Sequence, residues 1–421
     1  MDRREGSLEQ PQMGRAQPAL WRNVNFWLIW SGQTISTLGT SISTLALPLL
    51  MLALTHSLAL TGLLVAARQL PYLLFSLPAG ALVDRWDRKT TMVWCDVVRW
   101  LALGSVPLAF ALGYLTLLHL YLVVFLEGSA YVLFSLAQIS ALPQVVAPED
   151  LSRAYSFDTI MEYVGILLGP ALAAFIIGLA PAVEVGALLA YLADSLSYLI
   201  SVLSLLWIRI SFQIERVERR EPRKLVHEIA EGLRFLWGQR NLRLMAGLSA
   251  LVNFLTSPII LAFIALAQNG LHLSVQMLGF ILSAGGVGGL LGGLLAPWLR
   301  SRLSSGRLLL LIAGIWAVAT LLLALIPWLP LVVAGKFVIS LLYPIYAVIV
   351  VSYRLELTPT ALQGRVNSAF RSLSYGSEPL GAALGGFLLF AFGAQAVFGF
   401  MAVGFVGCAL FVMWSRLSRV E

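Results

Sequence analysis

Residues 80–89 read Gly80-Ala-Leu-Val-Asp-Arg-Trp-Asp-Arg-Lys89, and three of these ten residues are basic. The segment separates two long apolar stretches, one beginning at residue 58 and the other at residue 90. About twenty apolar residues in a row are enough for one α-helix to cross a lipid bilayer. We therefore expect a short loop here that joins two transmembrane helices.

The same alternation of apolar stretch and short break continues along the chain. It predicts an all-α integral membrane protein with twelve transmembrane helices, at residues 25–54, 58–83, 90–114, 118–143, 155–179, 185–208, 244–269, 274–299, 308–326, 330–353, 367–391 and 393–415.

The basic residues mark one side of the membrane. Of the 28 Lys and Arg residues, twenty-four fall in alternate breaks or at the chain ends, and the intervening breaks hold none. Nine of them lie between Arg209 and Arg243. The positive-inside rule makes this side cytoplasmic. The pattern thus predicts a multi-pass protein of a bacterial-type plasma (inner) membrane with both termini in the cytoplasm.

The composition excludes other classes of protein. With 59% hydrophobic and 12% charged residues, the chain is far less charged than a water-soluble globule. The net charge of +7 is spread over loops beside the membrane, where it sets topology and meets anionic lipid, so we expect no nucleic-acid partner. The polar first twenty residues indicate no cleavable signal peptide.

Cys95 and Cys408 fall inside predicted helices and suggest no disulfide or metal site. The absence of a phosphate-binding loop disfavours an ATP-driven pump. We expect no cofactor and no enzymatic activity.

The breaks divide the chain into two halves. We predict a cytoplasmic tail at 1–20, a six-helix bundle at 21–208, a cytoplasmic linker at 209–243, a second six-helix bundle at 244–415 and a tail at 416–421.

The linker carries apolar residues at helical spacing: Leu225, Ile229, Leu233 and Leu236. They favour an amphipathic helix on the membrane surface, and a solvated linker helix is the alternative.

The two halves resemble each other in sequence. Pro148, Leu151, Gly165 and Pro170 have counterparts 211 residues later, at Pro359, Leu362, Gly376 and Gly381. Two parallel six-helix repeats around a central substrate site are one recurrent plan of secondary transporters.

These motifs resemble the major facilitator superfamily over nearly the whole chain. The segment from Gly80 to Lys89 is similar to the family's loop between helices two and three, with Asp87 in place of a usual glycine. Gly165-x-x-x-Gly169-Pro170 resembles a motif of proton-linked exporters, although Ala173 and Ala174 replace its closing glycines and Val124 stands where span four usually has Arg. The segments 148–154 and 364–368 are most similar to the twelve-span drug:proton antiporter branch that includes macrolide efflux proteins and the enterobactin exporter.

Two groups of residues are expected to control conformation. Gly80 permits close helix contact, Asp84 can accept hydrogen bonds from the start of span eleven, and the bases can pair with acids or lipid phosphates. Together they form a candidate latch for one orientation of the halves: Gly80, Asp84, Arg85, Arg88 and Lys89. A role in topology alone is the alternative.

In span five, Gly165, Gly169 and Pro170 predict close packing with a helix bend that serves gating. Simple packing without a gating role is the alternative.

Ionisable residues inside membrane spans are costly unless they face a cavity or a partner. Asp96 and Arg99 are three residues apart and predict a structural ion pair. Asp158 and Arg371 lie near the inner boundary, where a helix start and snorkelling explain them. Five deeper residues are candidates for proton coupling or for lining the cavity: Arg68, Glu127, Glu162, Lys336 and Glu378.

The resemblance implies that spans one, four, seven and ten line the cavity. Glu127 and Lys336 would then face each other across it, while Arg68 and Glu378 lie at comparable depth on adjoining spans. We hypothesise that Glu127 alternates between a protonated state and an ionised, paired state as the halves rock. A fixed structural pair is the alternative.

The sequence therefore predicts a monomeric secondary transporter that exports a hydrophobic or amphipathic small molecule, such as a drug, macrolide or siderophore-like compound, by alternating access and in exchange for protons. The alternative is a lipid or lysophospholipid transporter, or a uniporter, of the same fold without proton coupling.

Overall fold

The computed structural model describes residues 20–83, 86–208, 212, 225–359, 362–415 and 417. Its α-helices are α1 (Val24–Thr55), α2 (Leu58–Val83), α3 (Arg88–Ala111), α4 (Leu117–Val145), α5 (Leu151–Gly178), α6 (Val183–Trp207), α7 (Leu225–Gly238), α8 (Arg240–Thr256), α9 (Ile259–Ala265), α10 (Val275–Arg302), α11 (Ser305–Leu325), α12 (Leu329–Leu357), α13 (Gln363–Tyr375) and α14 (Glu378–Trp414). Three short elements, η1 (Leu20–Arg22), η2 (Pro148–Asp150) and η3 (Leu266–Gly270), complete them.

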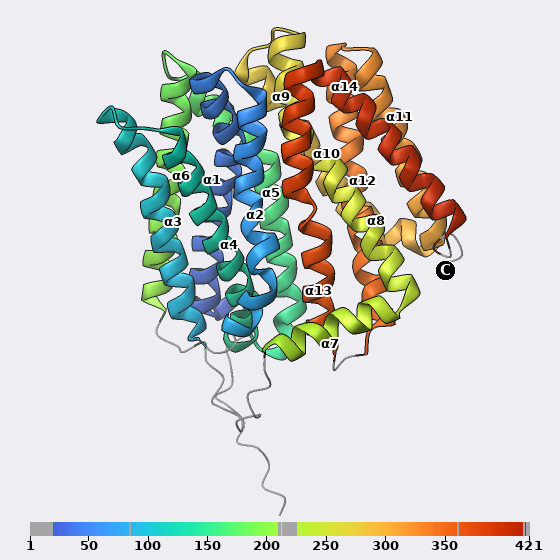
Figure 1. The fold of residues 1–421 in the computed structure, drawn as a ribbon. Helices are drawn as coiled ribbons and strands as arrows, with labels where there is room; N and C mark the ends of the chain where they lie inside the picture. The colour runs from blue at the N-terminus through green and yellow to red at the C-terminus, as the bar shows by residue number, and fades with distance from the viewer. Residues whose placement is uncertain are drawn as a thin grey trace, which may run out of the picture.

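The helices form two bundles that stand side by side (Figure 1). The N-terminal half contains α1 to α6, and the C-terminal half contains α8 to α14. Helix α7 lies across one end of the molecule, which we call the α7 end. The described chain starts at this end and also finishes toward it, after α14 (Figure 1). The predicted all-α fold with two pseudo-symmetric six-helix bundles is confirmed.

Side-chain caps fix several helix starts. Asn23 accepts a hydrogen bond from the backbone N–H of Phe26 at 3.1 Å, before α1. Asp87 does the same for Thr90 at 2.7 Å, before α3. Capping oxygens satisfy amides that have no partner within the helix. The polar residues of the breaks therefore define where these membrane helices begin.

Helix α14 contains a reversal of direction at Gly393. The backbone of Gly393 has φ +79°, a conformation that residues with a Cβ atom rarely adopt. The chain rises to the end opposite α7 and then returns, as the two red segments of Figure 1 show. The apolar helical region Gln363–Trp414 therefore crosses the membrane twice, as spans eleven and twelve.

Two spans of the C-terminal half are interrupted near their middle. Span seven breaks at Ser257 and Pro258, between α8 and α9. Span eleven breaks at Gly376 and Ser377, between α13 and α14. Proline removes one backbone donor from a helix, and glycine weakens the helix. Neither break is apparent from the apolar pattern of the sequence.

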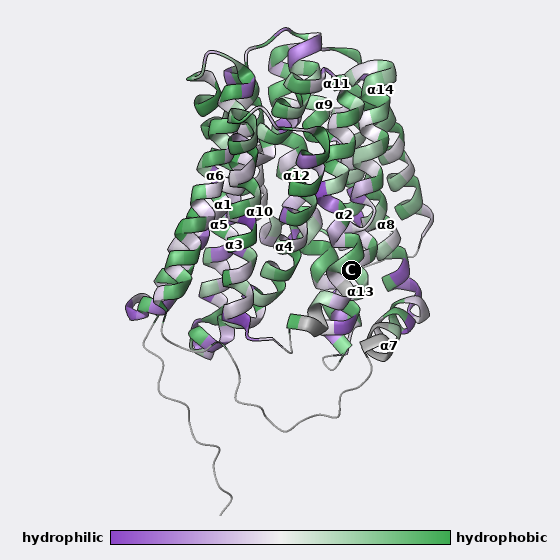
Figure 2. Cartoon of the chain, turned by 60° about the vertical axis from the view of Figure 1, so that its left-hand side comes forward, coloured by the Kyte–Doolittle hydropathy of each residue, from purple (hydrophilic) through white to green (hydrophobic). Residues whose placement is uncertain are grey.

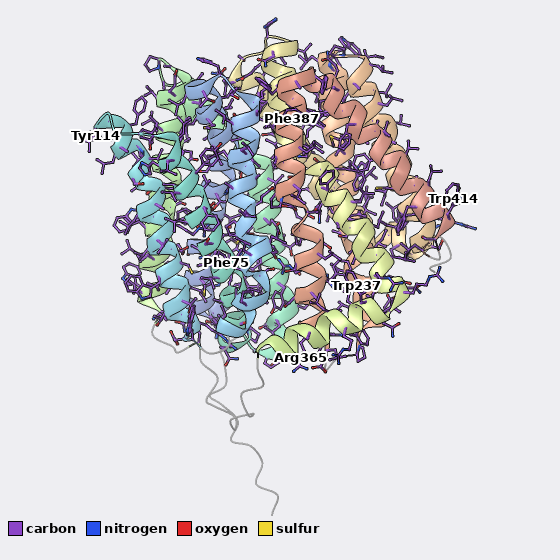
Figure 3. All side chains as sticks on the ribbon, in the orientation of Figure 1. Phe75, Tyr114, Trp237, Arg365, Phe387 and Trp414 are labelled. Atoms are coloured by element: carbon purple, nitrogen blue, oxygen red, sulfur yellow. The ribbon has the colours of Figure 1, made fainter. Side chains whose placement is uncertain are left out.

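The outer surface of the bundles is apolar. Green, hydrophobic residues cover most of the helices in Figure 2, and hydrophilic residues gather at the ends and at a few positions at mid-height. Tyr114 and Trp414 project from the edges of the molecule in Figure 3 and are 76% and 81% exposed. Only a lipid environment makes so large an exposed apolar surface favourable.

Helix α7 covers the linker residues for which a helix was predicted. It packs against α13: a Cβ atom on Gly232 would lie 2.6 Å from the carbonyl oxygen of Arg365. Glu231 also forms an ion pair with Arg365, whose place at the α7 end is labelled in Figure 3. Leu236 is fully buried and Leu233 is 37% exposed. Helix α7 therefore belongs to the linker and packs against the C-terminal half.

Candidate functional site

A cavity lies between the two halves at the centre of the molecule. Its deeper part has a volume of about 630 Å³, and a second part of about 730 Å³ extends toward the α7 end. The two parts share lining residues, among them Tyr131, Glu162 and Arg371, so they form one space. Gln138 and Tyr155 of the N-terminal half and Arg354 and Asn367 of the C-terminal half line its mouth.

The opposite end of the cavity is closed by close helix contacts between the halves. A Cβ atom on Gly62 of α2 would lie 2.5 Å from the Cα atom of Gly386 of α14. On the other side, a Cβ atom on Gly286 of α10 would lie 2.2 Å from the Cα atom of Leu167 of α5. Small residues let membrane helices approach this closely. The structure is therefore open at the α7 end and sealed at the other.

Glu127 of α4 is held by two arginines. Its carboxylate accepts hydrogen bonds from Arg68 Nε at 2.7 Å and from Arg68 Nη2 at 3.3 Å. A third bond comes from Arg99 Nη2 at 3.5 Å. Glu127 is buried, whereas the Arg68 side chain is 21% exposed toward the cavity that both residues line. Arg68 is therefore the partner that a bound molecule can reach.

Arg99 of α3 links Glu127 to a second acid. Its Nη1 lies 3.4 Å from Asp96 Oδ1, which confirms the ion pair predicted from their spacing. Its guanidinium stacks 3.9 Å from the centre of the Tyr198 ring and also donates to the Tyr198 hydroxyl. Asp96 accepts a further bond from Ser201 at 2.6 Å. Tyr198 and Ser201 do not stand out in the sequence, because hydroxyl residues are frequent in every membrane helix.

All these ion-paired residues belong to the N-terminal half. Arg68, Asp96, Arg99 and Glu127 lie on α2, α3 and α4. A rigid rocking of one half against the other therefore does not separate the charges. This differs from the expected arrangement, in which Glu127 paired across the cavity with the other half.

Lys336 of α12 lies outside this group of ion-paired residues. It lines a smaller cavity of about 120 Å³, together with Ser41, Thr44 and Pro170 of the N-terminal half. Its Nζ lies 5.7 Å from the centre of the Phe263 ring, and it makes no ion pair with any residue that the structure describes. The expectation that Lys336 and Glu127 face each other across the central cavity is not met in this conformation, because Glu127 lines the central cavity and Lys336 lines a smaller one beside it.

The central cavity brings charges of both halves together. Glu162 of α5 and Glu378 of α14 line it without a side-chain hydrogen bond or ion pair to a described residue. Arg371 of α13 attracts the Glu162 carboxylate from the other half. Its guanidinium lies 5.6 Å from the ring centres of both Tyr72 and Tyr375.

Two sequence interpretations change as a result. Arg371 lines the cavity and does not snorkel to the surface. Asp158, expected at a helix start, lies seven residues inside α5 and lines the mouth of the cavity. Arg68 and Glu378 do line the same cavity, although Arg68 pairs with Glu127.

The candidate latch residues are placed only in part. Asp84 and Arg85 lie outside the described residues, and Gly80 lies near the end of α2. Arg88 donates to the carbonyl oxygen of Ser140 at 2.9 Å, and Lys89 donates to that of Ile208. Both contacts stay within the N-terminal half. A contact of the latch with span eleven remains a prediction.

The glycines of span five lie against α1. Cβ atoms on Gly165 and Gly169 would come within 2.7 Å and 2.4 Å of Ser41 side-chain atoms. The carbonyl oxygen of the next residue, Pro170, would lie 2.9 Å from a Cβ atom on Gly279 of α10. The motif thus joins helix packing inside one half to the contact between the halves.

Two similar helical halves that span a membrane around a cavity closed at one end define a membrane transporter of the major facilitator fold. Residues 17–381 match the model of the transmembrane secretion effector family, and the chain belongs to this family of major facilitator transporters. It is therefore a transporter and not an enzyme.

Known relatives are similar along most of their length. The chain is 28% identical over 387 residues to the multidrug efflux pump Tap of Mycobacterium tuberculosis. The aligned region covers 88% of each protein. It is 27% identical over 303 residues to macrolide efflux protein A of Streptococcus pyogenes, which covers 70% of this chain and 71% of that protein.

Solved structures share the fold. A bacterial homolog of the human lysosomal transporter Spinster, in an inward-facing and occupied conformation, superposes with a TM-score of 0.75 at 14% identity, over 96% of this chain and 98% of that one. A D-xylose–proton symporter superposes with a TM-score of 0.74 at 15% identity, over 94% and 98% of the two chains.

Proposed function

We propose that this transporter exports a hydrophobic or amphipathic small molecule from the cytoplasm by alternating access, in exchange for protons. The observation that carries the proposal is the central cavity, which is open at the α7 end and sealed at the other. The similarity to multidrug and macrolide efflux proteins supports drugs as cargo.

The direction of transport follows from placing the α7 end in the cytoplasm of a bacterial-type inner membrane. Arg300 and Arg302 end α10 there, and Arg365 lies beside α7. Basic residues concentrate on the cytoplasmic side of membrane proteins. In this orientation the cavity admits cargo from the cytoplasm, and both termini are cytoplasmic. The protein works as a monomer, since one chain supplies the whole cavity.

The lining of the cavity suits an aromatic or amphipathic molecule. Five tyrosine side chains contribute to its wall: Tyr72, Tyr131, Tyr163, Tyr343 and Tyr375. Apolar and aromatic walls with a few polar groups are typical of small-molecule sites. The deeper part of the cavity, at about 630 Å³, also lies within the usual range for drug-sized ligands.

Proton coupling is proposed to act through Glu127. In the state described here Glu127 is ionised and paired with Arg68 and Arg99. A molecule that enters the cavity competes for Arg68, the more exposed partner. Once Arg68 moves away, Glu127 has lost its strongest contact and takes up a proton. Coupling then arises from competition between substrate and proton inside one half, and not from separation of the halves.

The test is transport by purified protein in liposomes. Ethidium, a lipophilic cation, and radiolabelled erythromycin, a macrolide, serve as probes, with and without an imposed pH gradient. The proposal expects the gradient to drive accumulation of at least one probe and expects Glu127→Gln to abolish this effect. Glu356→Gln, at an exposed acid of the α7 end, is the control variant.

Two outcomes would contradict the proposal. Transport that ignores the gradient would favour the uniporter of the same fold. Movement of lysophosphatidylcholine without movement of either drug would favour the lipid transporter.

A further inference from the structure

Five ionisable side chains gather in the core of the N-terminal half: Arg68, Asp96, Arg99, Glu127 and Asp194. Apart from Arg68, each is at most 5% exposed. Three acids and two arginines leave one negative charge in excess if every group is ionised. An uncompensated charge is strongly disfavoured in a membrane interior. One of the three carboxyl groups is therefore expected to carry a proton.

Two of the three acids, Glu127 and Asp96, are paired with arginines. Glu127 accepts hydrogen bonds from Arg68 and Arg99. Asp96 pairs with Arg99 at 3.4 Å and accepts a bond from Ser201 at 2.6 Å. Charge-assisted hydrogen bonds stabilise the ionised form of each acid. Neither Glu127 nor Asp96 is therefore expected to carry the proton.

Asp194 of α6 differs from the other two acids. It is 1% exposed, and its Oδ2 has no hydrogen-bond partner among the described residues. Its Oδ1 lies 3.3 Å from the Ser197 hydroxyl. That hydroxyl has one hydrogen, and it donates at the shorter distance of 2.7 Å to the backbone carbonyl of Asp194. Asp194 forms no ion pair with a described residue, and besides Ser197 only the Ser43 hydroxyl of α1 supports its ionised form, so it has the weakest support for a negative charge of the three acids.

A small void joins Asp194 to Glu127. It measures about 10 Å³, about the volume that one water molecule requires. The helices packed around Asp194 present Ser43 from α1, Arg68 from α2, Arg99 from α3 and Glu127 from α4, while α6 itself adds Tyr191 and Tyr198. Helix α5 also packs on α6, but its acids Asp158 and Glu162 line the central cavity instead.

We propose that Asp194 is a proton-binding site and holds the proton of the buried cluster in this conformation. The proton exchanges with Glu127 through a water molecule in the void. The O–H bond of Asp194 breaks, the water passes one proton on, and an O–H bond forms on Glu127, so the total charge of the cluster is unchanged. Glu127 borders the central cavity and is the point where the proton enters or leaves. This inference rests on the proposed proton exchange.

Infrared spectroscopy of the purified protein in lipid tests the site without transport. The difference between wild type and Asp194→Asn at neutral pH should contain the band of a protonated carboxyl group, shifted in heavy water. Glu184→Gln, at an acid near the start of the same helix, should show only a carboxylate band. Loss of a carboxylate band in Asp194→Asn would overturn the proposal.

Stability provides a second readout. Asparagine has nearly the shape of a neutral aspartic acid, so Asp194→Asn should retain the thermal unfolding midpoint of the wild type. A protein that fails to fold after this change would show that the negative charge is needed, which contradicts the proposal. Ser43→Ala, across the void, should shift the frequency of the protonated band.

Transport then separates this inference from the proposed function. Asp194→Asn should lose the acceleration of ethidium transport by a pH gradient, whereas Glu184→Gln should keep it. A wild type that ignores the gradient would overturn the proposed function. A gradient-driven wild type with an equally driven Asp194→Asn variant would overturn the role of Asp194 alone.

Discussion

Gly62 of α2 and Gly386 of α14 meet backbone to backbone across the two halves. A Cβ atom on Gly62 would lie 2.5 Å from the Cα atom of Gly386 and 2.8 Å from the carbonyl oxygen of Ala382. No flexible side chain is present at this point to move aside. The sealed end of the cavity therefore depends on the absence of two methyl groups.

Gly62→Ala should weaken this seal and shift the protein toward a state that is open at the opposite end. The measurement uses Thr44→Cys, a cavity position on α1, in a chain whose two native cysteines are replaced by alanine. A membrane-impermeant thiol reagent applied from the end opposite α7 should label Thr44→Cys several-fold faster when Gly62→Ala is present. Gly314→Ala, where a Cβ atom meets nothing within 4 Å, should leave the rate unchanged. Equal rates in both variants would contradict the role of this contact.

The Arg68–Glu127 pair should show strong energetic coupling. Removal of one partner from a buried ion pair costs about 3–5 kcal/mol, because the other charge is left unpaired. We expect Arg68→Gln and Glu127→Gln each to lower the free energy of unfolding by about this amount. The double variant should lose less than the sum, with a coupling of roughly 0.5–3 kcal/mol. Denaturation in mixed micelles measures all four proteins.

The exposed pair Arg300–Glu356 is the matched control for this cycle. Its atoms approach to 2.6 Å, but its side chains are 32% and 58% exposed. Pairs in such positions contribute about 0–1 kcal/mol. Similar coupling energies for the two pairs would show that burial does not strengthen the Arg68–Glu127 interaction.

Glu162 and Glu378 should favour cationic cargo. Both carboxylates line the cavity without a side-chain hydrogen bond or ion pair to a described residue. A hydrogen bond to a charged group contributes about 1.5–3 kcal/mol, which corresponds to roughly 10- to 150-fold in affinity. Glu378→Gln should weaken ethidium binding to the purified protein within this range and leave binding of Nile red, a neutral dye, unchanged. Equal losses for both dyes would indicate a change of cavity shape instead.

The two ends of the chain should react from the same side of the membrane. Single cysteines at positions 12 and 420 are expected to resist an impermeant reagent in intact cells and to react in inside-out vesicles. Tyr114→Cys, between α3 and α4, should show the reverse pattern, because it lies at the other end of the bundle (Figure 3). Reaction of positions 12 and 420 from opposite sides would contradict the even number of crossings.

The sequence predicted the helices closely, because a membrane helix must contain a long apolar run and its ends must be polar. The predicted span 58–83 coincides with α2, and span 25–54 differs from α1 by one residue at each end. The breaks at Ser257 and Gly376 were missed, since Pro258 and Gly376 also occur in helices that continue. The candidate site was predicted in part: Arg68, Glu127, Glu162 and Glu378 all line the central cavity, but the partners of Glu127 were not recognised.

By itself, the sequence determined that this chain crosses a membrane, how often it does so and on which side its charges are expected. These features follow from the order of apolar and polar residues along the chain, because lipid imposes the same requirement on every span. Only the tertiary structure decided that Glu127 pairs with Arg68 and Arg99 inside one half, and that Lys336 lines a smaller cavity that Glu127 does not reach. Which buried charges meet depends on the rotation of each helix about its axis, and that rotation is set by the packing of all its neighbours.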